Sequence, residues 1–152
     1  LNAAAAVVGG RGENIDAIEN PRGLYFIVVF PGIEISTGHA YRWLDESGRD
    51  ESVFMQNQLI KDIYHSDLSV YRKFSNDFAA VLSEKYPEFS IIIKDLLKAG
   101  SVYCNLTGSG SVVFGLFNSE KEAENGLLEM KKRHKFVQKI KSLDRIPYAI
   151  LE

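Results

Sequence analysis

The sequence is poor in cysteine, with one in 152 residues. A single thiol, Cys104, excludes an internal disulfide framework and fits a reducing compartment, which predicts a cytoplasmic protein. Cys104 stands within an apolar run, and this favours a buried strand residue over a nucleophile. The three histidines (His39, His65 and His134) are scattered, without an i,i+4 pair or a Cys-x-x-Cys motif. We therefore expect no metal site.

The chain also lacks an excess of charge, a long apolar run and the common catalytic motifs. Its net charge of −2 predicts no general attraction to nucleic acid or to anionic membranes. No stretch approaches the length needed to span a bilayer. Neither a Gly-x-Ser-x-Gly elbow nor a Gly-x-x-x-x-Gly-Lys-Ser/Thr loop occurs. Residues 131–135 are basic but lack interleaved aromatics, so a solvated helix end is favoured over a nucleic-acid patch.

What remains is the composition of an ordinary globular protein, 45% hydrophobic and 25% charged. The length predicts one domain, or one domain and a fragment. Residues 4–18 form two strand patterns around a Gly9–Gly12 turn, and residues 20–23 break the pattern. Because the first residue is Leu1 and the pattern begins within a strand, we expect the chain to be part of a longer protein.

From Leu24 onward, strand and helix patterns alternate. Residues 24–30 form a continuous apolar run typical of a central strand covered on both faces. The patterns that follow predict a helix at 38–44 after Ser36-Thr37, a loop at 45–51, a short helix or loop at 53–64, and a helix at 67–86. A further helix is expected at 89–99, with Ile92, Ile93, Leu96 and Leu97 inward, and strands at 102–106 and 112–117. A capping box at Ser119 predicts a helix to about residue 135, with Ala123, Leu127 and Met130 inward, and an edge strand at 137–143 and a tail at 146–152 complete the chain. This order predicts an α+β, ferredoxin-like split βαβ fold, with an antiparallel sheet and helices on one face.

Two segments are candidates for binding. Gly108-Ser109-Gly110, between the apolar strands, is typical of a plain hairpin. The same glycines, with hydroxyls from Thr107 and Ser111, could instead form an anion-binding turn. Both interpretations stay open on the pattern alone.

The second segment follows the central strand directly and contains Ser36, Thr37, His39 and Tyr41. At the start of a helix, such side chains can face a ligand. The ring of Tyr41 could stack on a planar base, or it could be a core aromatic like Trp43.

Four segments resemble one family, and they occur in the family's order. They are 6–15 (AVVGGRGENI), 31–41 (PGIEISTGHAY), 76–78 (NDF) and 106–115 (LTGSGSVVFG). The family is the GHMP small-molecule kinases. The last segment is specific to the superfamily. The 36–41 segment resembles members that act on a cytidyl-linked alcohol of non-mevalonate isoprenoid biosynthesis.

The resemblance implies that this chain is the C-terminal part of an ATP-dependent kinase acting on an alcohol. Residues 1–22 would be trailing strands of an N-terminal kinase domain, and residues 23–152 the GHMP kinase C-terminal domain. The catalytic aspartate and the loop that holds ATP with Mg would lie upstream, so no catalytic residue is expected in this chain, and the chain alone should be inactive. The expected ligands are the cytidyl substrate and ATP.

The resemblance also implies substrate-binding residues. Tyr41 would stack on the cytosine ring, with Thr37 beside it. The loop residues Thr107, Gly108, Ser109 and Gly110 would support the phosphate loop or contact the substrate. Two alternatives stay open: another GHMP kinase, of the homoserine or mevalonate type, and a non-catalytic ferredoxin-like ligand-binding module.

Overall fold

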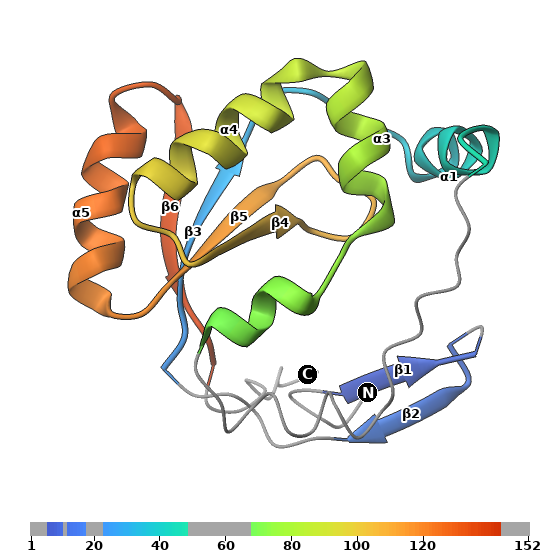
Figure 1. The fold of residues 1–152 in the computed structure, drawn as a ribbon, viewed down its shortest axis with the longest axis horizontal. Helices are drawn as coiled ribbons and strands as arrows, with labels where there is room; N and C mark the ends of the chain where they lie inside the picture. Colours follow the sequence, from blue (N-terminus) through green and yellow to red (C-terminus); the bar gives the residue numbers. More distant parts are fainter. Residues whose placement is uncertain (1–5, 11, 18–22, 49–67, 144–152) are drawn as a thin grey trace, which may run out of the picture.

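The computed structural model describes residues 6–10, 12–17, 23–48 and 68–143 (Figure 1). The first described element is an antiparallel hairpin of β1 (Ala6–Gly9) and β2 (Asn14–Ala17), which confirms the strand pair expected there. Its apolar side chains are poorly covered, because Val8 is 55% exposed and Ile15 is 51% exposed. The expected tail and the segment at 53–64 lie outside the described residues.

The main sheet has four antiparallel strands in the order β4-β5-β3-β6. They are β3 (Tyr25–Phe30), β4 (Tyr103–Leu106), β5 (Val113–Phe117) and β6 (Phe136–Lys141). The first strand of the sheet is therefore central, between β5 and β6, and β6 is an edge. This confirms the ferredoxin-like α+β fold.

The described helices lie between these strands in the sequence. They are α1 (Thr37–Glu46), the 3₁₀ helix η1 (Leu68–Lys73), α3 (Asp77–Lys85), α4 (Pro87–Lys98) and α5 (Glu120–Lys131). Ser119 caps α5, since its Oγ accepts from the N–H of Glu122 at 3.2 Å. Gly100 follows α4 with φ +98°, a backbone conformation that glycine adopts at little cost.

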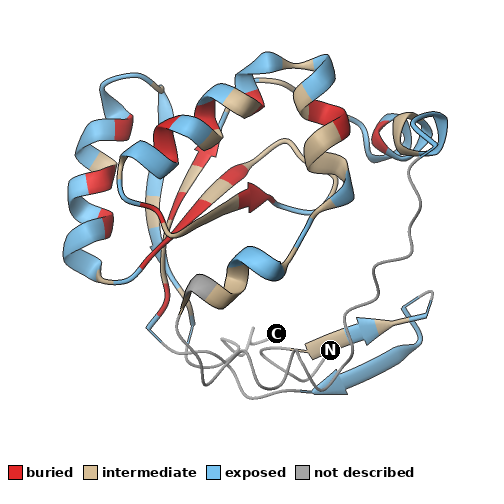
Figure 2. Cartoon of the chain, viewed as in Figure 1, coloured by how far each residue is buried: buried red, intermediate tan, exposed pale blue. Residues whose placement is uncertain are grey.

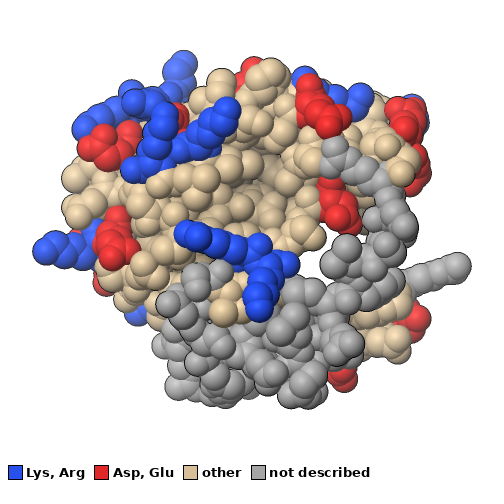
Figure 3. Space-filling view, in the orientation of Figure 1, with Lys and Arg blue, Asp and Glu red and all other residues tan. Residues whose placement is uncertain are grey.

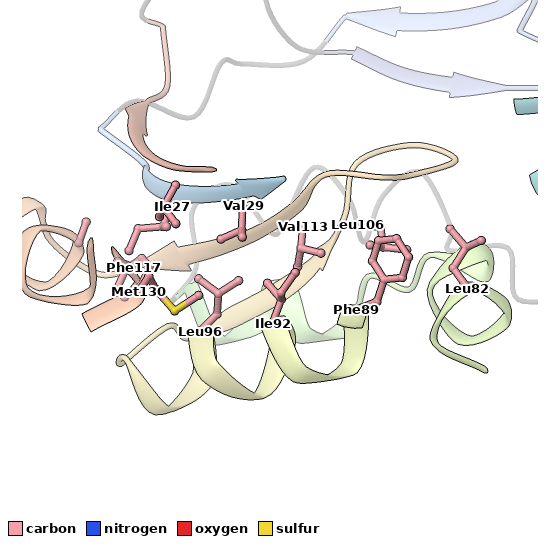
Figure 4. Close-up of a cluster of buried hydrophobic side chains, with 12 residues drawn as sticks. Ile27, Val29, Leu82, Phe89, Ile92, Leu96, Leu106, Val113, Phe117 and Met130 are labelled. Carbon is pink, nitrogen blue, oxygen red and sulfur yellow. The ribbon is translucent and has the colours of Figure 1, made fainter. Parts of the chain in front are cut away.

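The core lies between one face of the sheet and the inner sides of α4 and α5 (Figures 2 and 4). Alternate residues of β3, Ile27 and Val29, are fully buried on this face. Their partners include Val113 and Phe117 of β5, Phe89, Ile92 and Leu96 of α4, and Met130 of α5. Helices thus cover one face of the sheet, as predicted.

The expectation that β3 is covered on both faces was wrong for the described part of the chain. Phe26 and Val28 are half-buried, and Phe30 is exposed. Aromatic pairs cover this face in part, since Phe26 contacts Phe114 and Phe30 contacts Phe136, each with ring centroids 6.0 Å apart. Within the described residues, aromatic packing across neighbouring strands, rather than a helix, covers the second face of this apolar run.

The helix expected at 67–86 is also wrong, because it is two elements with a break at residues 74–76. Asn76 has φ −130° and ψ 116°, an extended conformation, and it caps α3. Asparagine competes with helical backbone by bonding nearby N–H groups, and this favours a cap over a helix interior. The tertiary bonds of the Asn76 amide, described below, hold the break in place.

Smaller corrections concern helix ends and faces. Asp45 and Glu46 belong to α1 rather than to a loop. Leu97 is 48% exposed, because the buried stripe of α4 runs through Phe89, Ile92 and Leu96 and leaves Leu97 beside it. Helix α5 ends at Lys131 instead of residue 135.

The basic segment 131–135 lies at the end of α5, as expected. Lys and Arg side chains gather over this end of the helix, with acidic ones among them (upper left of Figure 3). Asp95, a buried residue of α4, accepts from Arg133 at 2.9 Å and lies 3.1 Å from His134 Nε2. These contacts join the C-terminal ends of α4 and α5, so Arg133 and His134 of the basic segment help to hold the two helices together.

Candidate functional site

The first part of the candidate site is the start of α1. Ser36 ends the connection from β3 in an extended conformation, and its Oγ accepts from the N–H of His39 at 3.2 Å. This cap begins the helix at Thr37 and leaves Thr37 exposed at its first turn. One turn later Tyr41 is 54% exposed. The segment predicted to face a ligand is therefore accessible.

The two aromatics of α1 have different surroundings. Trp43 is half-buried and packs against Tyr86, with ring centroids 6.2 Å apart, and against the ammonium of Lys85 at 4.8 Å. Tyr41 is more exposed, and its ring meets that of Phe78 in a T-shaped arrangement with ring centroids 5.0 Å apart. The core interpretation suits Trp43, whereas Tyr41 keeps more than half of its surface for a ligand.

The second part is the loop between β4 and β5. The N–H of Thr107 donates to the carbonyl of Val112 at 2.9 Å, and the N–H of Gly110 donates to the carbonyl of Thr107 at 3.0 Å. These bonds close a hairpin, which confirms that interpretation. Gly108 and Gly110 have φ values of +50° and +94°, which explains why glycines stand there. An anion-binding turn would use the remaining N–H groups of the loop.

The structure brings these two parts together. Ser109 Oγ donates to Thr37 Oγ1 at 3.3 Å, across 72 residues of sequence. The next residue of the loop, Gly110, packs closely against Leu82 of α3, since a Cβ at Gly110 would lie 2.9 Å from Leu82 Cδ1. All six predicted substrate-binding residues thus lie on α1 or on the loop that touches it. Sequence spacing gives no sign of this contact, because it depends on tertiary packing.

An open groove of about 350 Å³ borders the loop, and sequence reasoning missed it. Its walls combine aromatic rings with amide and carboxylate groups: Ser75, Asn76, Asp77, Phe78, Tyr103, Asn105, Leu106, Gly108 and Phe114. Tyr103 and Asn105 belong to one network, in which Asn105 Nδ2 donates to the Tyr103 hydroxyl at 2.7 Å. The signal that could have found the groove is Asn105, a polar residue within an apolar strand.

Within the described ranges, no group of three His, Cys, Asp or Glu side chains is placed to hold a metal ion. None of the described helices is long and apolar enough to cross a membrane.

Cys104 is half-buried on β4, and burial raises the pKa of its thiol from 9.0 to about 11. The Ser101 hydroxyl lies 3.1 Å from Sγ and opposes this shift only in part. Since the thiolate is the nucleophilic form, this thiol is a poor nucleophile at neutral pH. The structure thus places Cys104 on a strand, as expected, although its side chain is half-buried rather than buried.

The raised thiol pKa predicts a loss of stability at alkaline pH. Between about pH 9 and 11 the unfolded chain releases the thiol proton and the folded chain retains it. The free energy of unfolding should therefore fall by up to about 1.4 kcal/mol per pH unit in that range. Urea unfolding of the native chain and of Cys104→Ala at several pH values measures this. The two pH curves should diverge above pH 9, and parallel curves would contradict the assignment.

Comparison with known proteins connects the site to a family. Residues 59–135 match the family described as GHMP kinases C terminal, which is half of the chain. The chain belongs to the GHMP kinases. A curated relative, 4-diphosphocytidyl-2-C-methyl-D-erythritol kinase of Chlorobium phaeobacteroides (strain BS1), is 36% identical over 121 residues. The alignment covers 79% of this chain and 42% of that protein.

Solved structures of two kinases share the fold. A crystal structure of 4-(cytidine 5'-diphospho)-2C-methyl-D-erythritol kinase matches 88% of this chain and 48% of its own, with a TM-score of 0.69 and 20% identity. Homoserine kinase from Cytophaga hutchinsonii matches 91% of this chain and 49% of its own, with a TM-score of 0.68 and 19% identity. The chain therefore spans about half the length of the GHMP kinases that it matches, and its fold is that of their C-terminal domain.

Proposed function

We propose that this chain is the C-terminal domain of an ATP-dependent kinase that phosphorylates the 2-hydroxyl of 4-diphosphocytidyl-2-C-methyl-D-erythritol. In this proposal residues 1–22 belong with the N-terminal half and residues 23–152 form the C-terminal domain. The exposed apolar side chains of the β1–β2 hairpin support that division. The name of the curated relative supports the substrate. The observation that carries the proposal is the Ser109–Thr37 contact, which joins two family motifs at one site.

The exposed side chains of this site have distinct roles in the proposal. Tyr41 stacks on the cytosine ring, since an accessible aromatic face binds a base without needing hydrogen bonds. Thr37, beside it, presents a hydroxyl. Residues 107–110 border the alcohol and the transferred phosphoryl group, where hydroxyls and glycine N–H groups can approach closely. Phosphoryl transfer depends mainly on such positioning and on charge neutralisation.

ATP with Mg is proposed to be held mainly by the N-terminal half. The proposal assigns no magnesium ligand to the described residues, among which no group of three His, Cys, Asp or Glu side chains is placed to hold a metal ion. When bound, ATP supplies the phosphoryl group, and this chain orients the acceptor alcohol. Homoserine and mevalonate kinases are less favoured as alternatives, because the curated relative at 36% identity is named for the cytidyl substrate. The homoserine and mevalonate kinase structures, at 19% and 15% identity, support the shared fold alone.

The test uses the full-length kinase that carries this chain. ADP release should be ATP-dependent and much faster with the cytidyl substrate than with homoserine or mevalonate. The isolated 152-residue chain should release no ADP with any of them. Preference for another alcohol would contradict the proposed substrate, and turnover by the isolated chain would contradict the division of the machinery.

A further inference from the structure

At the break between η1 and α3, the side chain of Asn76 bonds both to the β4–β5 loop and to the start of α3, which carries the Phe78 ring beside Tyr41. Asn76 Nδ2 donates to the carbonyls of Leu106 at 3.1 Å and Gly108 at 2.8 Å. Its Oδ1 accepts from the N–H of Phe78 at 3.0 Å. Two carbonyls on one side and one N–H on the other fix the orientation of the amide, because only its nitrogen can donate.

The oxygen side of Asn76 acts on the aromatic part of the site. By capping α3 it fixes the backbone of Phe78 at the start of that helix. The ring of Phe78 packs against the Tyr41 ring in a T-shaped arrangement, with ring centroids 5.0 Å apart. The orientation of Tyr41 therefore depends on where α3 begins.

The nitrogen side of Asn76 acts on the glycine loop. Leu106 is the last residue of β4, and Gly108 lies two residues further, where φ becomes positive. Bonds to both carbonyls hold the strand end and the loop against α3. The next residue, Ser109, makes the contact with Thr37. The position of the loop relative to α1 therefore depends on the same amide.

We propose that Asn76 is a positioning residue of the phosphoryl-transfer site, holding the glycine loop through Nδ2 and the Tyr41 ring through the α3 cap. This rests on the proposed function, since it assigns those two parts to the alcohol and to the base. An amide is required, because it offers two N–H donors for the two carbonyls together with an oxygen that accepts from the Phe78 N–H. Serine or aspartate at this position would cap α3 but could not hold both carbonyls.

The kinetic test compares three variants of the full-length kinase. Asn76→Asp and Asn76→Ser keep a cap acceptor and lose the bonds to the loop. We expect kcat to fall by about tenfold to a hundredfold, with the KM for the cytidyl substrate nearly unchanged, since small displacements of positioning groups cost rates of this size. Asn76→Ala loses the cap as well, and its KM for the cytidyl substrate should also rise.

Ser119→Ala is the matched control for lost stability. It removes an N-cap hydroxyl of α5, on the opposite side of the domain from the loop (Figure 1). It should lower the melting temperature and leave kcat and KM unchanged. Equal kinetic losses in Ser119→Ala and Asn76→Ser, or unchanged kcat in both Asn76→Asp and Asn76→Ser, would overturn the proposal.

A structural measurement tests the role of Asn76 independently of which alcohol the kinase phosphorylates. In the 152-residue chain, hydrogen exchange of the Gly110 N–H should accelerate in Asn76→Asp and Asn76→Ser, because the Thr107–Gly110 turn loses its support. Exchange of the α5 amides should stay the same. If the kinase prefers another alcohol, faster loop exchange with reduced kcat on that alcohol would still support the role of Asn76. Unchanged loop exchange would overturn it for any substrate.

Discussion

Replacing Phe117 with alanine should lower the free energy of unfolding by about 3–5 kcal/mol. The ring is fully buried at the junction of β5, α5 and β3. Helix α5 approaches it so closely that a Cβ at Gly126 would lie 2.8 Å from Phe117 Cε1. Backbone rather than a flexible side chain forms this wall, so the cavity cannot easily collapse. Urea unfolding of the 152-residue chain, at constant m-value, measures the loss.

Phe136→Ala is the matched control for this prediction. Phe136 is also a phenylalanine on a strand of the same sheet, but it is 60% exposed on edge strand β6. Its replacement removes little buried surface and should cost less than about 1 kcal/mol. Similar losses for Phe117→Ala and Phe136→Ala would show that the core is not packed as described.

The second large effect is expected for the cytidyl substrate in the full-length kinase. Tyr41→Ala should raise its KM by about tenfold to a hundredfold, since a base stacked on an aromatic ring contributes roughly 1–3 kcal/mol. The KM for ATP should change little, because ATP is proposed to bind mainly in the other half. Initial rates with each substrate varied in turn give both constants.

Tyr41→Phe is the control, because it keeps the ring and its T-shaped contact with Phe78. Its KM for the cytidyl substrate should remain close to that of the native kinase. Leu97→Ala, at another exposed apolar residue, controls for non-specific effects and should change neither KM. Equal increases in both KM values for Tyr41→Ala would count against stacking.

The sheet and most helices could be predicted because their patterns are local. Apolar runs at residues 25–30 and 113–117 indicate strands, and Ser119 indicates a helix start. The break at Asn76 could not be predicted from periodicity, because the apolar spacing continues across it. What ends the helix there is a set of bonds to Leu106 and Gly108, 30 and 32 residues away.

The candidate site was predictable in its members but not in its arrangement. Family resemblance implied Thr37, Tyr41 and residues 107–110. Their contact through Ser109, the groove beside Asn105 and the dual role of Asn76 depend on tertiary packing. No spacing rule encodes a hydrogen bond between residues 72 positions apart.

The strand order β4-β5-β3-β6 has a consequence for how the domain is made. β3 leaves the ribosome before both of its neighbours, and it pairs with residues 113–117 and 136–141. Its apolar run, YFIVVF, therefore has neither of its partner strands until more than eighty further residues have been synthesised. Such long-range pairing makes folding slow and leaves an apolar segment prone to aggregation in the meantime. We expect nascent chains that end before β5 to require a chaperone.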